Sequence, residues 1–92
     1  MHSGKLFISI LLLTVATNSA LADYEQGLDA VFRGDYETAF REFTVAAEAG
    51  LDVAQYNLAI LYFTGQGVDQ NLEQAFRWTE AAALQGLSLI HI

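Results

Sequence analysis

An internal repeat limits the possible folds of this chain more than any other feature. The segments Ala39-Phe40-Arg41, Ala46-Ala47 and Gly50 recur 36 positions later as Ala75-Phe76-Arg77, Ala82-Ala83 and Gly86. A period of this length is typical of helical repeats, in which each unit buries its apolar face against a neighbour. The sequence therefore predicts two related units.

Local signals divide these units into helices over residues 24–33, 36–49, 53–64 and 72–85. The predicted N-caps are Asp23, Asp35, Asp52 and Asn71, and the predicted stops are Gly34, Gly50, Gly65 and Gly86. A Gln follows Asp23, Asp52 and Asn71 after three positions, as in a capping box. Glycine ends helices because it adopts the left-handed conformation without a Cβ penalty. The expected fold class is all-α, an α-α hairpin solenoid of two helix pairs preceded by a signal-peptide helix.

Two family resemblances agree with this division. Residues 51–86 resemble a Sel1-like repeat, and residues 23–50 are similar to a tetratricopeptide helix hairpin. The resemblance implies structural roles in the repeat for Ala39, Gly50, Ala54, Leu58, Ala59, Tyr62, Gly65, Gly67, Ala75, Trp78, Ala82 and Gly86. Both families typically act as protein-binding scaffolds, so an unidentified protein or peptide is the implied partner.

Residues 1–22 have the three-part pattern of a secretory signal peptide. Lys5 precedes an apolar run from Leu6 to Val15, and Ala20 and Ala22 form an A-x-A cleavage site. The alternative, a membrane anchor, requires roughly 20 apolar residues, and this run ends sooner. We therefore expect an exported bacterial protein with no stable membrane span after cleavage, located in the periplasm rather than the extracellular medium.

Residues 87–92 depart from the repeat pattern. Their sequence, LSLIHI, resembles the translation of a transposon end used in sequencing libraries. We expect this tail to be non-native or frayed. The alternative is a genuine apolar C-terminus that docks on the last helix.

Composition argues against nucleic-acid binding and catalysis. Without the leader, 3 basic residues face 11 acidic ones, a net charge of 3 − 11 = −8, which repels phosphate backbones. The sequence has no Cys, and residues 23–86 contain no His, Ser or Lys, which removes most nucleophiles and every group with an ordinary pKa near neutrality. No cofactor or metal is expected, and nucleic acid is excluded as a partner.

One apolar pattern recurs in the first helix of each unit and is the candidate partner-binding stripe. It consists of Tyr24, Leu28 and Val31, followed by Tyr56, Ile60 and Phe63. The i, i+4, i+7 spacing places each set on one helical face. Such a stripe suits a bound peptide, or else it packs against adjacent helices.

The favoured function is a non-catalytic interaction scaffold of the bacterial cell envelope that binds a protein or peptide on a concave helical surface. Two alternatives stay open. One is an envelope hydrolase that uses carboxylates such as Glu42 or Glu48. The other is a structural adaptor for a domain beyond Gly86.

Overall fold

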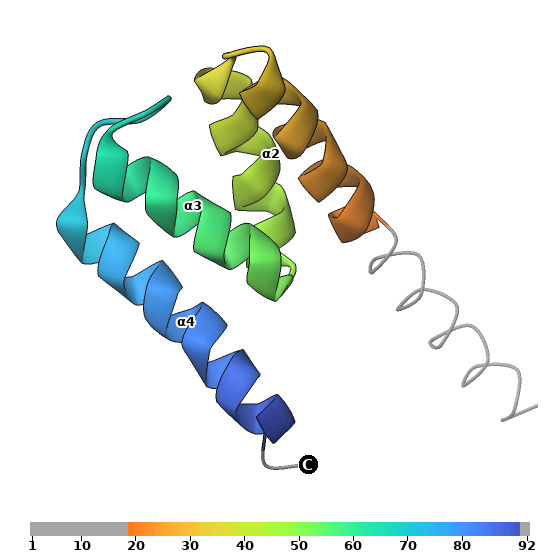
Figure 1. Ribbon diagram of the computed structural model, residues 1–92, viewed down its shortest axis with the longest axis vertical. Coiled ribbons are helices and arrows are strands. Elements are labelled where there is room, and N and C mark those ends of the chain that lie inside the picture. Colours follow the sequence, from red (N-terminus) through yellow and green to blue (C-terminus); the bar gives the residue numbers. More distant parts are fainter. Residues whose placement is uncertain (1–18, 91–92) are drawn as a thin grey trace, which may run out of the picture.

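The computed structural model describes the backbone of residues 19–90 and the side chains of residues 19–86, and each regular element in this part is a helix (Figure 1). A helix over residues 19–32 is followed by α2 (Tyr36–Glu48), α3 (Asp52–Thr64) and α4 (Leu72–Ile90). The predicted all-α class is therefore confirmed. Most of the predicted signal peptide, residues 1–18, lies outside the described residues, as do residues 91–92.

The helices pair as two hairpins in chain order. The first hairpin consists of helix 19–32 and α2, and the second consists of α3 and α4. In Figure 1, helix 19–32 (orange) runs beside α2, and α3 lies between α2 and α4. Since α3 packs against both α2 and α4, it joins the two hairpins into one stack.

Two of the four predicted helix caps are confirmed. The Asp35 carboxylate accepts hydrogen bonds from the Thr38 backbone N–H at 3.2 Å and from the Thr38 hydroxyl at 2.7 Å. The Asn71 side-chain oxygen accepts a hydrogen bond from the Gln74 N–H at 3.1 Å. Each side chain thus satisfies a backbone donor that has no partner within its helix.

The other two predicted caps are wrong. Asp23 lies inside a helix that already includes residue 19, because Ala20 is buried and its packing carries the helix past the expected start. Asp52 is the first residue of α3, and Leu51 holds the N-cap position without a side-chain hydrogen bond. The predicted cleavage site at Ala20 and Ala22 lies within the described part of the N-terminal helix.

The predicted helix stop at Gly86 is also wrong. Gly34, Gly50 and Gly65 have φ values of 75°, 96° and 72°, the left-handed conformation expected after a helix. By contrast, Gly86 lies within α4, which continues to Ile90. Glycine permits a helix to end but does not force it, and costs only about 1 kcal/mol relative to Ala within a helix.

The core forms where small residues let the helices approach closely. Phe43 and Leu58 are the largest fully buried side chains. Their cluster includes Ala30, Ala39, Ala46, Ala47, Ala54 and Leu61, and Tyr62 and Trp78 pack against it. A Cβ at position 27 would lie 2.5 Å from the Phe43 ring, so Gly27 provides the space that this ring fills.

Two further contacts fix the second hairpin against the first. Gln55 is buried, donates a hydrogen bond to the Ala47 carbonyl at 3.2 Å, and accepts one from the Gln85 side chain at 2.8 Å. Gly67, in the turn before α4, has a φ of 76°, and a Cβ there would lie 2.1 Å from the Tyr36 carbonyl oxygen. The turn therefore lies directly against the start of α2.

Candidate partner-binding surface

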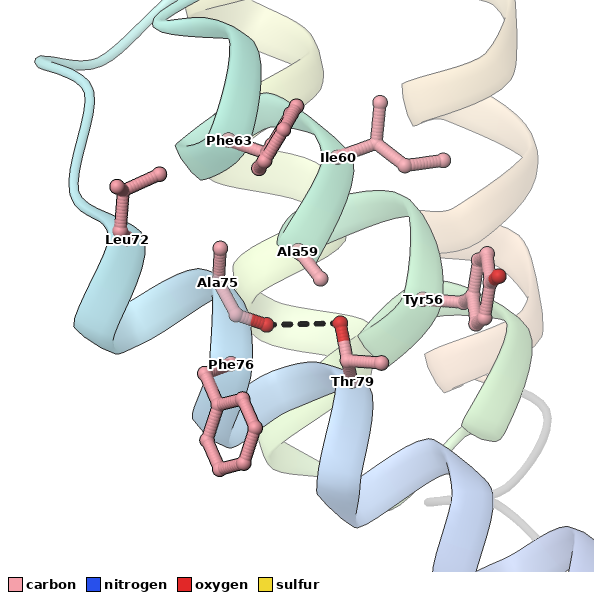
Figure 2. A pocket seen from close by; sticks show the side chains of 8 residues that line it. All are labelled: Tyr56, Ala59, Ile60, Phe63, Leu72, Ala75, Phe76 and Thr79. Carbon is pink, nitrogen blue, oxygen red and sulfur yellow. Dashed lines mark hydrogen bonds between the residues drawn. The ribbon is translucent and has the colours of Figure 1, made fainter.

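An apolar pocket of about 400 Å³ lies between α3 and α4 (Figure 2). Its lining residues are Tyr56, Ala59, Ile60, Phe63, Leu72, Ala75, Phe76 and Thr79. None of these side chains is charged. The Thr79 hydroxyl donates to the Ala75 carbonyl at 2.8 Å, so the main polar group on the α4 side is already satisfied. The pocket therefore offers apolar contact rather than acid-base chemistry.

Five large apolar or aromatic side chains of this pocket are exposed. The exposed fractions are 57% for Tyr56, 44% for Ile60, 61% for Phe63, 58% for Leu72 and 69% for Phe76. Scattered exposed apolar residues are ordinary, but a contiguous group around a hollow marks an interaction site. No described residue covers this group.

The repeat explains why the second hairpin is hollow here. Phe43, which fills the first hairpin, corresponds to Thr79 in the second, 36 positions later. Gly27, which makes room for the Phe43 ring, corresponds to Ala59. A small polar side chain thus stands where the first hairpin has a buried aromatic ring. In the first hairpin, that ring also lies 5.6 Å from the Tyr24 ring, centroid to centroid.

The structure places the two halves of the predicted stripe in different surroundings. Tyr56, Ile60 and Phe63 are exposed and line the pocket together. Their counterparts Tyr24, Leu28 and Val31 are half-buried and pack against the core cluster. The Tyr24 hydroxyl also accepts a hydrogen bond from the Asn57 side chain of α3 at 3.3 Å. The six residues therefore do not share one open surface.

The pocket residues on α4 escaped the sequence-based search for a binding surface. Leu72, Phe76 and Thr79 line it but were not predicted as partner-binding residues. The signal that could have identified them was the repeat itself, since replacement of a buried aromatic by Thr79 at an equivalent position predicts a hollow beside it.

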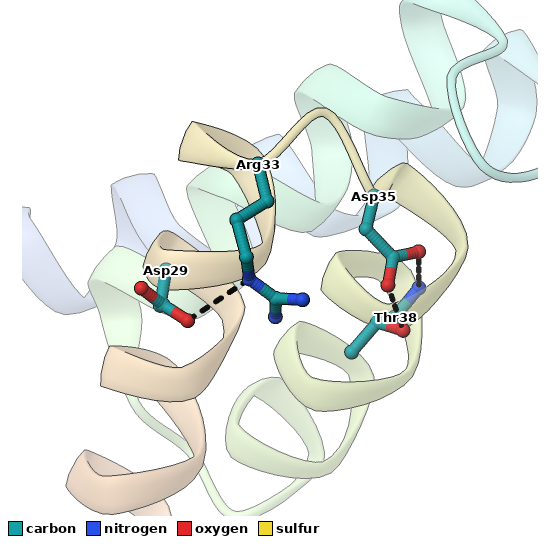
Figure 3. A network of polar contacts seen from close by, with 4 residues as sticks. All are labelled: Asp29, Arg33, Asp35 and Thr38. Carbon is teal, nitrogen blue, oxygen red and sulfur yellow. Dashed lines mark hydrogen bonds and ion pairs between the residues drawn. The ribbon is translucent and has the colours of Figure 1, made fainter.

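A polar cluster at the turn of the first hairpin is structural (Figure 3). The Arg33 guanidinium lies 3.1 Å from the Asp29 carboxylate, in an ion pair whose side chains are both largely exposed. Exposed pairs of this kind contribute between 0 and about 1 kcal/mol. Neighbouring Asp35 and Thr38 make the cap of α2 described above.

Hydrogen bonds also shift the acidity of this cap. The Thr38 hydroxyl and then the Thr38 backbone N–H, both bonded to the carboxylate, hold the pKa of Asp35 below its ordinary value of 3.8. Nearby Arg33 and Arg41 act in the same direction, and desolvation opposes them. The lowered pKa belongs to a helix cap, so it does not indicate a general acid.

The described residues contain no group of acidic side chains gathered to hold a metal ion. Glu42 is half-buried and Glu48 is exposed, both on α2. Within the same part of the chain, no helix combines the length and apolarity that a membrane crossing requires.

Comparison with known proteins agrees with the two-hairpin architecture. Over 70 residues the chain is 40% identical to the "Chitin synthase regulator SKT5" of Saccharomyces cerevisiae (strain ATCC 204508 / S288c), a match that covers 76% of this chain and 10% of that relative. The chain thus spans about a tenth of the relative's length. Because the relative is a yeast protein, it does not support the expected bacterial origin, which stays a prediction. No solved structure gives a significant match.

The family comparison covers both hairpins. The model of the Sel1 repeat matches residues 18–51 and residues 52–87. Sel1 repeats are a non-enzymatic scaffold type and generally mediate protein-protein interactions. The chain belongs to the Sel1-repeat family.

Proposed function

We propose that this protein is a non-catalytic interaction scaffold that binds a protein or peptide at the pocket between α3 and α4. The observation that carries the proposal is the pocket itself, an uncharged hollow of about 400 Å³ whose edge is formed by exposed aromatic and aliphatic side chains. Buried aromatic anchors supply much of the energy of protein interfaces. Tyr56, Phe63 and Phe76 provide three such side chains on one surface.

Family and composition support the same function. Sel1 repeats generally bind proteins, and the yeast relative is named as a regulator of an enzyme. The absence of His, Ser, Cys and Lys between residues 23 and 86 leaves few groups for catalysis. Glu42 and Glu48 do not line the pocket, so a carboxylate-dependent hydrolase gains no support from its geometry.

The direct test is site-specific photo-cross-linking. A benzophenone side chain replaces Phe63 in the pocket, and a matched variant carries it in place of Val45, which is exposed on α2 and outside the pocket. We expect a defined protein to be captured from position 63 and not from position 45. The captured protein is then purified and shown to bind the unmodified chain. Equal capture from both positions, or none from position 63, would contradict the proposal.

We further propose that the protein acts after export, in the periplasm of a bacterium. The proposal rests on Lys5, the apolar run from Leu6 to Val15, and the small residues at Ala20 and Ala22. Expression with the leader in a bacterium should yield a periplasmic product whose N-terminal residue is Asp23. The matched control, Ala22→Tyr, should block this cleavage. Recovery of the uncleaved chain from the cytoplasm would contradict export.

A further inference from the structure

The pocket corresponds to a surface that is already occupied elsewhere in the same molecule. The exposed α3 residues Tyr56, Ile60 and Phe63 correspond to Tyr24, Leu28 and Val31, 32 positions earlier. On the α4 side, Phe76 corresponds to Phe40, 36 positions earlier. In the first hairpin these equivalent residues pack against a core to which α3 contributes Ala54, Leu58 and Leu61. The pocket is therefore the second hairpin's counterpart of the surface that α3 covers on the first.

The contacts of α3 define what such a surface accepts. Ala54, Leu58 and Leu61 are buried and lie at i, i+4 and i+7, so they share one helical face. Asn57 adds a polar contact, because its amide donates to the Tyr24 hydroxyl at 3.3 Å. Tyr56 provides the equivalent hydroxyl in the second hairpin. A matching ligand is therefore a helix with the pattern Ala-x-x-Asn-Leu-x-x-Leu.

An aromatic contact extends this match. The Tyr62 ring of α3 meets the Phe40 ring edge-on, with centroids 5.3 Å apart. In the second hairpin the equivalent of Phe40 is Phe76, which is exposed beside the pocket. A ligand helix that carries an aromatic residue directly after the last leucine of the pattern, as α3 does at Tyr62, would find the same partner there.

The path of the chain indicates where the ligand helix comes from. After α2, Gly50 takes a φ of 96° and the chain turns back to place α3 on the first hairpin. The equivalent Gly86 lies within α4, which continues to Ile90. The chain therefore continues along the axis of α4 and, within the described residues, does not return across the pocket. We infer that the pocket binds an amphipathic helix of a partner protein that carries the Ala-x-x-Asn-Leu-x-x-Leu face of α3. This inference rests on the proposed scaffold function and specifies the chemistry of its partner.

The test uses a synthetic helix as the probe. A fluorescent, side-chain-stapled peptide of 13 residues, the length of α3, carries the pattern with Tyr after the last Leu and alternating Glu and Lys elsewhere. A control peptide with the same staple has Ser at both Leu positions. Binding to the full chain is followed by fluorescence anisotropy. We expect saturable binding of the first peptide and binding at least about tenfold weaker for the control, a difference of roughly 1.4 kcal/mol.

Two protein variants locate the bound peptide. Ile60→Glu places a charge in the pocket at a side chain that is 44% exposed, so the fold should persist, and circular dichroism checks this. Val45→Glu makes the same change at an exposed position of α2 outside the pocket. We expect Ile60→Glu to weaken peptide binding at least about tenfold and Val45→Glu to leave it unchanged. Equal effects of the two variants would overturn the inference.

A double-mutant cycle tests the polar contact. Tyr56→Phe removes the protein hydroxyl, and Ala in place of the peptide Asn removes the amide. If the ligand sits as α3 does, each change weakens binding and the two together weaken it no further than either one alone. Additive losses would overturn the assigned orientation of the helix.

Other occupants of the pocket give distinct results. A concentration-dependent dimer in sedimentation velocity that Ile60→Glu abolishes would mean that a second copy fills the pocket, and would overturn the inference. The same holds if the cross-linker at position 63 reacts with a later part of its own polypeptide in a longer natural chain. Failure of peptide binding while that cross-linker still captures a partner would overturn the helix inference alone. Peptide binding without any captured partner would contradict the proposed function alone.

Discussion

Two glycines with nearly identical backbone conformations allow a sharp test of how the turn before α4 is held. Gly34 has a φ of 75° and a Cβ added there would meet nothing within 4 Å. Gly67 has a φ of 76°, but a Cβ would lie 2.1 Å from the Tyr36 carbonyl oxygen and 2.5 Å from its carbon. The variants Gly34→Ala and Gly67→Ala therefore impose the same backbone strain and differ in the contact that they create.

The expected magnitudes follow from this difference. A left-handed conformation costs a non-glycine residue roughly 1–2 kcal/mol. Removing glycine from the unfolded chain returns about 0.4–1 kcal/mol, so Gly34→Ala should cost about 1 kcal/mol. At Gly67 the obstacle is backbone, which cannot rotate away as a side chain can, so the turn must separate from α2. Overpacking costs roughly 1–3 kcal/mol, and we expect Gly67→Ala to reach about 3–4 kcal/mol in total.

Urea denaturation of both variants, followed by far-ultraviolet circular dichroism, measures the two costs. We expect the free energy of unfolding to fall about 2–3 kcal/mol further for Gly67→Ala than for Gly34→Ala, with unchanged slopes against urea concentration. For a domain of this size, 1 kcal/mol corresponds to a Tm shift of roughly 4–8 °C, so thermal melts provide an independent measure. Equal costs would refute the conclusion that the turn lies against the start of α2.

Three further predictions concern the core and the caps. Gly27→Ala should lower the free energy of unfolding by about 1 kcal/mol, because contact with the Phe43 ring outweighs the helix propensity gained, and chemical denaturation checks the sign. Since the pKa of the Asp35 carboxyl is held below 3.8 in the folded protein, its cap contributes fully above that pH and is lost as the pH falls through the lowered value. Asp35→Asn, which retains a capping oxygen that does not titrate, should remove this part of the acid sensitivity in denaturation curves recorded from neutral to acidic pH, and Thr38→Val should weaken the cap at neutral pH. Gln55→Leu should cost about 1–3 kcal/mol in the same denaturation assay, because it leaves a carbonyl at the end of α2 without its hydrogen-bond donor; an unchanged stability would show that water replaces the lost bond.

Local signals predicted helix identity well and helix ends unevenly. Asp35 and Asn71 cap their helices as predicted, because each side chain needs only a backbone N–H three positions later. The prediction failed at Asp23, where the buried Ala20 extends the helix upstream, and at Gly86, where α4 simply continues. A cap or a glycine is a local preference of about 1 kcal/mol, and tertiary packing can override a preference of that size.

The sequence by itself determined the two helical units, the placement of Ala and Gly where helices meet, and the Sel1-like character of the chain. It also identified one apolar stripe in each unit, but it could not distinguish the two stripes, since Tyr24, Leu28 and Val31 have the same spacing as Tyr56, Ile60 and Phe63. Only the tertiary structure decided their surroundings, because α3 lies against the first set and no described residue covers the second. Periodicity fixes which side chains share a face of a helix, whereas the burial of that face depends on which other helix packs against it.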